Sequence, residues 1–247
     1  MRDDLRPDYG MDAPAIVKRF AALGAASLAV TVALALSLQP GAVKSALLVV
    51  GISATLSAIF PALSIPFGSL VLKFKVRDWL LRQVAWNSAG SERVLDVGCG
   101  HGLLLIGVAK RLVTGRAVGL DLWAQDDQAS NSREAALHNA DLEGVRAKVE
   151  VLNGDMRKMP FADSQFDLIV SSWAIHNIYD RAQRQIALAE IVRVLKPDGQ
   201  IAIVDIERTS EYLAFFSAAG LKDVRKLGPK FTFGNLSYLV LARKPKP

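Results

Sequence analysis

The sequence predicts an α/β fold with a mostly parallel sheet, preceded by two long apolar helices. From Arg93 onward, short runs rich in β-branched residues alternate with segments of helical periodicity. Before that point, two long stretches contain no charged residue. The chain has 247 residues, 51% of them hydrophobic, so we expect a membrane-anchoring region over residues 1–82 and an α/β domain over residues 83–247.

The first uncharged stretch covers residues 20–38, which is 19 residues and close to what a membrane-spanning helix needs. Two other interpretations remain open for it. A secretory signal would also follow a pair of cations, here Lys18 and Arg19, although the apolar run is long for one. The two apolar helices could instead be buried in a soluble protein, which would need a large core around them.

The second uncharged stretch covers residues 45–72, after a turn signal at residues 39–41. Pro61 and Pro66 lie inside it, and proline usually breaks or kinks a helix. We therefore expect the second membrane helix at about residues 45–63. The following segment combines cations with Trp79 and Trp86, which is typical either of an interfacial helix or of a plain linker helix.

The charges around the two stretches predict their orientation, because Lys and Arg tend to remain on the cytoplasmic side. Only Lys44 lies between the stretches. Cations flank the outer ends: Arg2, Arg6, Lys18, Arg19, Lys73, Lys75, Arg77 and Arg82. We therefore expect an integral membrane protein with both ends, and the whole α/β domain, in the cytoplasm.

The α/β region is expected to place its ligands beyond the carboxyl ends of the parallel strands. Five buried strands are predicted at residues 93–97, 117–121, 148–155, 166–172 and 200–206. The tail supplies two further candidate strands, at residues 221–228 and 236–244. Helical segments separate the earlier strands. The loops after those strands therefore form the candidate site.

The first of these loops contains Gly98, Gly100 and Gly102. Glycines allow a ligand to approach backbone N–H groups at a helix N-terminus, which favours a carboxylate or a phosphate. A tight turn without a ligand is the alternative. The spacing lacks the third glycine of a dinucleotide fingerprint, which disfavours a nicotinamide cofactor.

Acidic residues end the next two strands. Asp121 could accept hydrogen bonds from both hydroxyls of a ribose, or could simply cap a helix. Asp155 could accept from the exocyclic amine of a purine, with Met156 packing on the ring. A turn aspartate beside a core methionine is the alternative for that pair.

Five motifs in order resemble those of class I S-adenosylmethionine-dependent methyltransferases, in particular the quinone-biosynthesis and related small-molecule enzymes. The motifs are VLDVGCGHG (94–102), VGLDLW (118–123), NGDMRKMPF (153–161), FDLIVSS (166–172) and RVLKPDGQI (193–201). The resemblance covers about residues 92–244. It implies a Rossmann-like, seven-stranded, mostly parallel sheet whose last strands form an antiparallel edge, with S-adenosylmethionine as cofactor.

The resemblance also assigns roles to residues. Asp96 and the glycine loop would hold the methionine moiety of the cofactor, Asp121 the ribose, and Asp155 with Met156 the adenine. It places Leu122 and Ser171 among the cofactor-binding residues as well. The acceptor would bind just past the fourth strand, near Ser171, Ser172, His176 and Asn177.

His176 is the candidate general base in that region, because an imidazole titrates near neutral pH. A hydrogen-bonded structural histidine is the alternative. A methyl acceptor requires a base only when it is acidic or weakly nucleophilic.

These observations predict a methyltransferase that acts on a small-molecule acceptor at the cytoplasmic membrane face, where an apolar, lipid-like or quinone-like acceptor is favoured. Two other functions remain open: a non-catalytic membrane protein that retains the fold, and a nicotinamide-dependent oxidoreductase. The net charge of +6 is not arranged in a basic stripe, so no nucleic-acid partner is expected. The three histidines and single cysteine, Cys99, lack ligand spacing, so no metal is expected.

Overall fold

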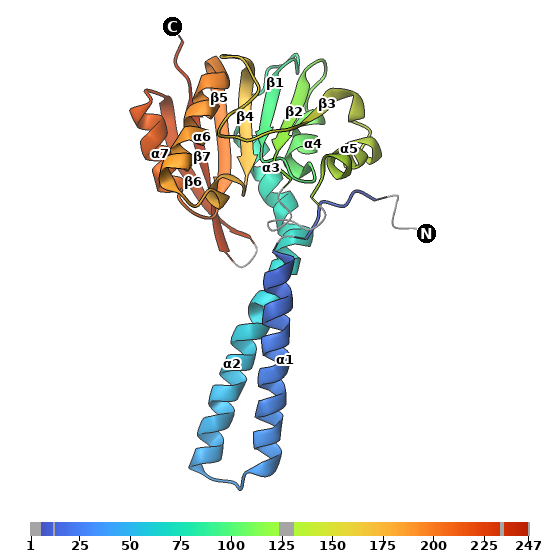
Figure 1. The fold of residues 1–247 in the computed structure, drawn as a ribbon, viewed down its shortest axis with the longest axis vertical. Helices are drawn as coiled ribbons and strands as arrows, with labels where there is room; N and C mark the ends of the chain where they lie inside the picture. Colours follow the sequence, from blue (N-terminus) through green and yellow to red (C-terminus); the bar gives the residue numbers. More distant parts are fainter. Residues whose placement is uncertain (1–5, 12, 124–130, 233–234, 247) are drawn as a thin grey trace.

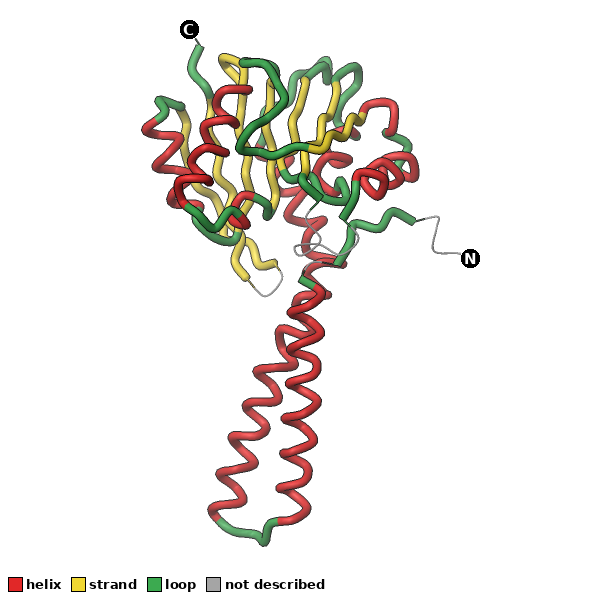
Figure 2. Tube along the Cα trace, viewed as in Figure 1, coloured by secondary structure: helices red, strands yellow, loops and turns green. Residues whose placement is uncertain are grey.

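The chain folds into a sheet domain from which a helical hairpin extends as a stalk (Figures 1 and 2). The computed structural model describes residues 6–11, 13–123, 131–232 and 235–246. The described N-terminal residues lie against the sheet domain rather than at the far end of the stalk. The chain therefore leaves the domain, runs down the stalk and returns.

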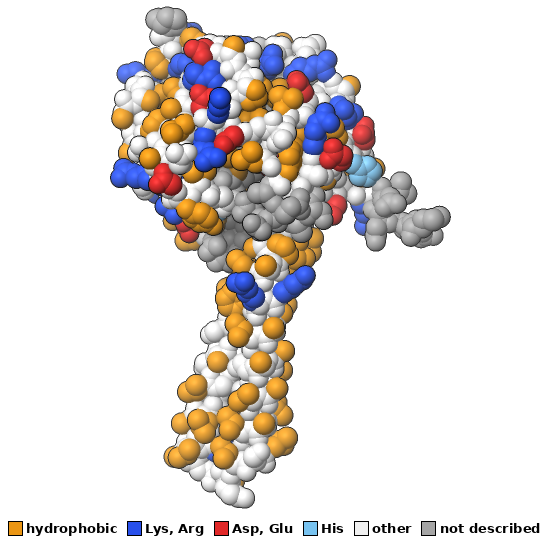
Figure 3. All heavy atoms as spheres, viewed as in Figure 1, with side chains coloured by type: hydrophobic (Ala, Val, Ile, Leu, Met, Phe, Trp, Pro, Cys, Tyr) orange, Lys and Arg blue, Asp and Glu red, His pale blue; other side chains and the backbone are white. Residues whose placement is uncertain are grey.

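The stalk consists of α1 (Pro14–Ser37) and α2 (Ala42–Phe67). Small residues line their contact: the Thr55 hydroxyl donates to Ser27 Oγ at 2.9 Å, and Gly51 leaves room for Thr31. Most large apolar side chains point outward and cover the stalk surface (Figure 3). By length and composition, Pro14–Ser37 and the helical stretch Ala42–Gln83 could each cross a membrane.

The expected break at Pro61 and Pro66 is wrong. Both prolines lie inside α2, which continues through a π-helical segment, η2 (Gly68–Leu72), into α3 (Lys73–Gln83). A proline removes one backbone hydrogen bond, and a wider π turn lets the chain continue as a helix beyond it. The second helical stretch therefore runs well past the expected end at residue 63.

The sheet has seven strands in the order β3-β2-β1-β4-β5-β7-β6. Their bounds are β1 (Arg93–Val97), β2 (Arg116–Asp121), β3 (Val149–Asn153), β4 (Phe166–Ser172), β5 (Leu195–Asp205), β6 (Lys222–Thr232) and β7 (Asn235–Arg243). The first five are parallel, and β7 pairs antiparallel with both β5 and β6. The predicted fold, including its antiparallel edge, is confirmed.

Helices cover both faces of the sheet. One face packs against α3, α4 (Leu103–Ala109) and α5 (Arg133–Leu142), and the other against α6 (Arg181–Val194) and α7 (Thr209–Ala218). Strand residues alternate between the two cores, as Val94 and Leu95 do. Leu80 and Leu81 of α3 are fully buried in the first core, so the stalk is anchored in the domain by the same helix that forms its second arm.

The carboxyl ends of the parallel strands lie on the side of the domain from which the stalk extends (Figure 1). The β6–β7 hairpin also points toward the stalk on this side. Any ligand bound at the strand ends therefore lies on the stalk-facing side of the domain.

Candidate cofactor and acceptor site

The glycine loop after β1 has a backbone that other residues could not adopt without strain. Gly98, Gly100 and Gly102 have φ values of 72°, 50° and 84°. A Cβ on Gly98 would lie 2.2 Å from the Cβ of Ala174 and 3.7 Å from the terminal methyl of Met156. The loops after β1, β3 and β4 therefore converge at Gly98, which brings together residues that the sequence separates widely.

Asp121, at the end of β2, is tied to the same loop. Its Oδ2 accepts from the backbone N–H of Gly100 at 2.8 Å, and its Oδ1 accepts from the N–H of Trp123 at 2.7 Å. Oδ1 also accepts from Asn131 Nδ2 at 3.4 Å, whereas Oδ2 can accept a second hydrogen bond. The carboxylate is thus oriented by the backbone and retains capacity for a ligand hydroxyl.

Asp96, in β1, is a buried carboxyl group. Its side-chain oxygens have no hydrogen-bond partner in the described ranges, and the residue is 1% exposed. Burial raises the pKa of Asp96 to about 8, and the nearby negative charge of Asp121 contributes. A cationic ligand group beside Asp96 would relieve both effects.

Asp155 follows β3 and is engaged by a neighbouring cation. The Arg157 guanidinium donates to it through Nε at 2.9 Å and Nη2 at 2.6 Å, and this hydrogen bonding lowers the pKa of Asp155. The carboxylate is therefore ionised at neutral pH. Met156, the next residue, places its methyl group near the glycine loop.

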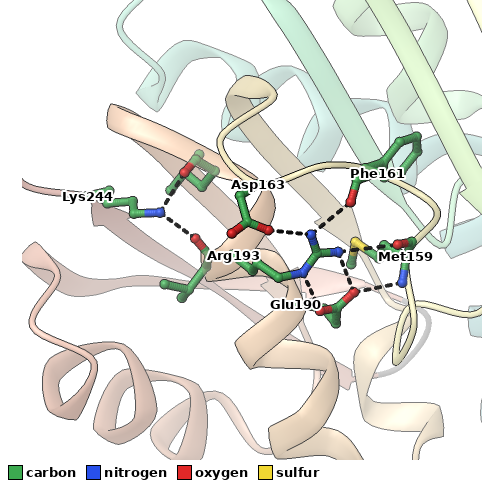
Figure 4. Close-up of polar contacts among 8 residues, drawn as sticks. Met159, Phe161, Asp163, Glu190, Arg193 and Lys244 are labelled. Carbon is green, nitrogen blue, oxygen red and sulfur yellow. Dashed lines mark hydrogen bonds and ion pairs between the residues drawn. The ribbon is translucent and has the colours of Figure 1, made fainter.

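The loop after β3 is held in place by Arg193 of α6 (Figure 4). The Arg193 guanidinium donates to the carbonyls of Phe161 at 2.8 Å and Met159 at 3.3 Å, and to carboxylate oxygens of Glu190 and Asp163. Glu190 in turn accepts from the N–H of Met159 at 2.8 Å. This cluster fixes the loop that carries Asp155 and Met156.

Two other predicted cofactor-binding residues, Ser171 and Leu122, do not contact the glycine loop in the same way as Asp121. The buried Ser171 hydroxyl donates to the carbonyl of Val97 at 2.7 Å, so it joins β4 to β1. Leu122 is 55% exposed beside Asp121. Their predicted contacts with the cofactor remain predictions.

His176 lies in a short 3₁₀ helix, η4 (Ile175–Asn177), after β4, and is paired with a residue that the sequence analysis did not name. Its Nδ1 lies 2.6 Å from Oδ1 of Asp205, the last residue of β5. The Asp205 carboxylate is fully buried and also accepts from Tyr212 at 3.0 Å and from the N–H of Ile206 at 2.8 Å. An acidic residue at the end of the predicted strand 200–206 was the available sequence signal.

Tyr212, in α7, supports this arrangement. Burial, together with the charge of Asp205, raises the pKa of the Tyr212 hydroxyl well above its usual value. The phenol therefore stays protonated and donates a hydrogen bond to Asp205. The Asp205 carboxylate is held from two sides while it faces His176.

The described N-terminal residues also reach the glycine loop, which the sequence did not suggest. The carbonyl of Asp8 accepts from Asn139 Nδ2 at 2.7 Å and lies 2.9 Å from Nδ1 of His101. The buried Lys73 ammonium donates to the carbonyls of Tyr9 and Gly10 at 2.8 and 2.6 Å. The segment before α1 is thereby attached to both the loop and the second helical stretch.

The fold of the sheet domain is similar to that of solved methyltransferase structures. Residues 95–203 match the family model described as "Methyltransferase domain". This match agrees with the predicted class I S-adenosylmethionine-dependent type and with S-adenosylmethionine as its cofactor. Among solved structures, an S-adenosylmethionine-dependent methyltransferase from Aquifex aeolicus has a TM-score of 0.53 at 23% identity, covering 68% of this chain and 88% of that one.

Two curated relatives are quinone-type methyltransferases. The chloroplastic 2-phytyl-1,4-beta-naphthoquinone methyltransferase of Arabidopsis thaliana is 27% identical over 149 residues, which are 60% of this chain and 54% of that protein. The ubiquinone/menaquinone biosynthesis C-methyltransferase UbiE of Dinoroseobacter shibae is 33% identical over 138 residues, 56% of this chain and 49% of that protein. This chain thus spans about half the length of the curated relatives it matches.

The residues at the strand ends fit the cofactor chemically. S-adenosylmethionine carries an ammonium group, which matches the buried carboxyl of Asp96. Its ribose hydroxyls match the acceptor capacity of Asp121.

Proposed function

We propose that this protein transfers a methyl group from S-adenosylmethionine to a small-molecule acceptor at the cytoplasmic face of a membrane. The observation that carries the proposal is the convergence of the loops after β1, β3 and β4 at Gly98, beside the oriented carboxylate of Asp121. The bound cofactor supplies an electrophilic methyl group on its sulfonium. The protein needs chiefly to position the acceptor and exclude water.

The cofactor-binding residues have distinct roles in this proposal. Asp96 and the Gly98–Gly102 backbone hold the methionine moiety, with the Asp96 carboxylate beside the ammonium. Asp121 accepts from the ribose hydroxyls, and Asp155 with Met156 binds the adenine. Arg157 already donates to Asp155, so the adenine amine would share that carboxylate with it.

His176 is the proposed general base for the acceptor. His176 Nδ1 lies 2.6 Å from Oδ1 of Asp205. A proton on Nδ1 would face the buried carboxylate, and Nε2 is the atom proposed to take the proton of the acceptor. As the acceptor loses its proton to Nε2, the imidazolium is stabilised by the buried negative charge of Asp205. Asp205 and Tyr212 are positioning residues, because they act through His176.

The membrane location is supported by the two exposed apolar helices, whose surface is suited to lipid (Figure 3). The proposed site lies at the strand ends, on the stalk-facing side of the domain. An apolar acceptor dissolved in the bilayer would reach such a site without crossing the domain. The names of the quinone-type relatives agree with an apolar, quinone-like acceptor.

The test is incubation of the purified full chain with membranes and methyl-labelled S-adenosylmethionine, followed by identification of the labelled compound. We expect label in the apolar small-molecule fraction. Absence of label from every small-molecule fraction, with cofactor binding intact, would contradict the proposed activity. A labelled water-soluble compound would retain methyl transfer and overturn the apolar acceptor.

A further inference from the structure

A groove of about 380 Å³ lies where the stalk meets the sheet domain. One wall is a single face of α3, on which Lys75, Trp79 and Arg82 follow one another at helical spacing. The other wall is the end of β6, with Lys230 and Phe231. Two elements far apart in the sequence thus form one cationic and aromatic surface.

The groove has an excess of positive charge. Lys75 and Arg82 form no ion pair within the described ranges, and the Lys230 ammonium lies 5.5 Å from the centre of the Trp79 ring. The carboxylate that lines the groove, Asp78, is paired with Arg77 at 2.8 Å. The three cations of the groove are therefore available to an anion.

The groove also lies at a polarity boundary. Immediately before α3, the large side chains of Phe67, Leu70 and Val71 are 55%, 64% and 38% exposed. Figure 3 shows Lys and Arg side chains on the upper part of the stalk, while the stalk below them is covered by apolar side chains. An amphipathic ligand could place its anionic end among the cations and its apolar chains along the stalk.

We propose that this groove binds the headgroup phosphate of an anionic phospholipid, an inference that rests on the membrane location proposed above. Lys75, Arg82 and Lys230 contact the phosphate. Trp79 lies between Lys75 and Arg82 along α3 and packs beside the headgroup with Phe231, since aromatic rings are favoured at the membrane interface. The bound lipid joins α3 to the β6–β7 hairpin. It thereby fixes the domain against the membrane surface with its strand ends toward the bilayer.

The test uses the full chain in a mild detergent, titrated with phosphatidylglycerol or phosphatidylcholine and measured by native mass spectrometry. We expect preferential retention of phosphatidylglycerol. The triple variant Lys75→Gln, Arg82→Gln, Lys230→Gln should weaken phosphatidylglycerol binding by at least about tenfold. Each Lys or Arg near an anionic lipid strengthens binding, and this variant removes three of them. Phosphatidylcholine binding should change little.

A matched control removes three exposed cations that do not line the groove: Arg146→Gln, Lys222→Gln and Lys246→Gln. This variant has the same net charge as the groove variant and should keep the lipid preference. Equal retention of the two lipids by the wild-type protein, or equal losses in both variants, would overturn the proposal. Equal S-adenosylmethionine affinity in the three proteins verifies the fold.

Two further measurements separate the possible failures. If inorganic phosphate binds the groove as tightly as phosphatidylglycerol does, the site is a phosphate site and the lipid assignment is wrong. Extraction of the wild-type protein from membranes with alkaline carbonate tests the membrane location alone. Carbonate-extractable protein that still prefers phosphatidylglycerol would refute the integral location while leaving the groove assignment in place.

Discussion

Nδ1 of His176 lies 2.6 Å from Oδ1 of Asp205, whose carboxylate is completely buried. The two residues end neighbouring parts of the sheet, since His176 follows β4 and Asp205 completes β5. Parallel pairing of these strands brings their carboxyl ends together. Residues 29 positions apart are thereby brought into contact, and the backbone N–H of His176 also donates to Oδ2 of Asp205 at 3.2 Å.

We expect His176→Ala to lower turnover by about 10²–10⁴-fold, the usual contribution of a positioned proton acceptor, with little change in S-adenosylmethionine affinity. Asp205→Asn should lower turnover as well and change the pH–rate profile, because the amide cannot stabilise the imidazolium. Tyr212→Phe is a milder control, since it removes one hydrogen bond to Asp205. Wild-type turnover of His176→Ala at every pH would remove the base from the mechanism.

Binding of S-adenosylmethionine is expected to release about one proton at pH 6–7. The pKa of Asp96 in the free protein is raised to about 8, so the carboxyl is protonated there, and a neighbouring ammonium favours its ionised form. Affinity should therefore rise with pH up to about 8. Calorimetry in two buffers of different ionisation enthalpy measures the proton count. Asp96→Asn should abolish the release, and an unchanged proton count in that variant would contradict the assignment.

The Asp121→Ala variant should bind S-adenosylmethionine at least about tenfold more weakly, because a charge-assisted hydrogen bond contributes about 1.5–3 kcal/mol. It also removes the acceptor that orients the N–H of Gly100. Asp121→Asn keeps one of the acceptors and should lose less. Calorimetry on the full chain distinguishes the three proteins, and equal affinities with intact folding would exclude Asp121 from the site.

Replacement of Arg193 should lower the free energy of unfolding. It should have a smaller effect on the activity of each molecule that is folded. Arg193→Met removes the donor shared by the carbonyls of Phe161 and Met159 and leaves Glu190 without its cation. We expect a loss of about 1–3 kcal/mol in the free energy of unfolding. Arg146→Met, at an exposed position, should change it by less than about 0.5 kcal/mol. Denaturant unfolding measures both, and equal values would mean that the Arg193 cluster contributes nothing measurable.

The topology can be tested with single cysteines at Gln39 and Ser91 in a Cys99→Ser background. We expect an impermeant reagent applied to intact cells to label position 39, between the two stalk helices, but not position 91. The reverse pattern would mean an inverted hairpin. Resistance to alkaline carbonate extraction is expected of the wild-type protein.

The sequence predicted the sheet well, because the strands are rich in β-branched residues and most of the parallel ones end at a glycine or an acidic residue. The antiparallel edge came from the resemblance and is confirmed by β6 and β7. Helix continuity through Pro61 and Pro66 could not be predicted, because the local cost of a proline does not reveal that a π turn follows it. Local sequence signals predicted individual helices and strands, but they did not predict that consecutive helices join into one continuous helical stretch.

The sequence indicated candidate site residues from their positions near strand ends and from the family resemblance. Asp121 and His176 were named for their positions, whereas Asp205 was passed over although it also lies at the end of a strand. The contact between Asp8 and His101 joins residues 93 positions apart. The hydrophobic periodicity of the sequence does not predict such a contact. The hydrogen bond from Ser171 to Val97 likewise depends on the pairing of strands rather than on the motif.

The unbroken helical path from Ala42 to Gln83 has a mechanical consequence. At about 1.5 Å per residue, its length is set by the chain itself, and its last turns are embedded in the domain core. With the hairpin in a bilayer, the helix would hold the strand ends at a fixed distance from the bilayer surface. Which membrane acceptors are methylated would then depend on two properties. One is how far the reactive ring can extend from the bilayer, and the other is how well the ring fits the acceptor site.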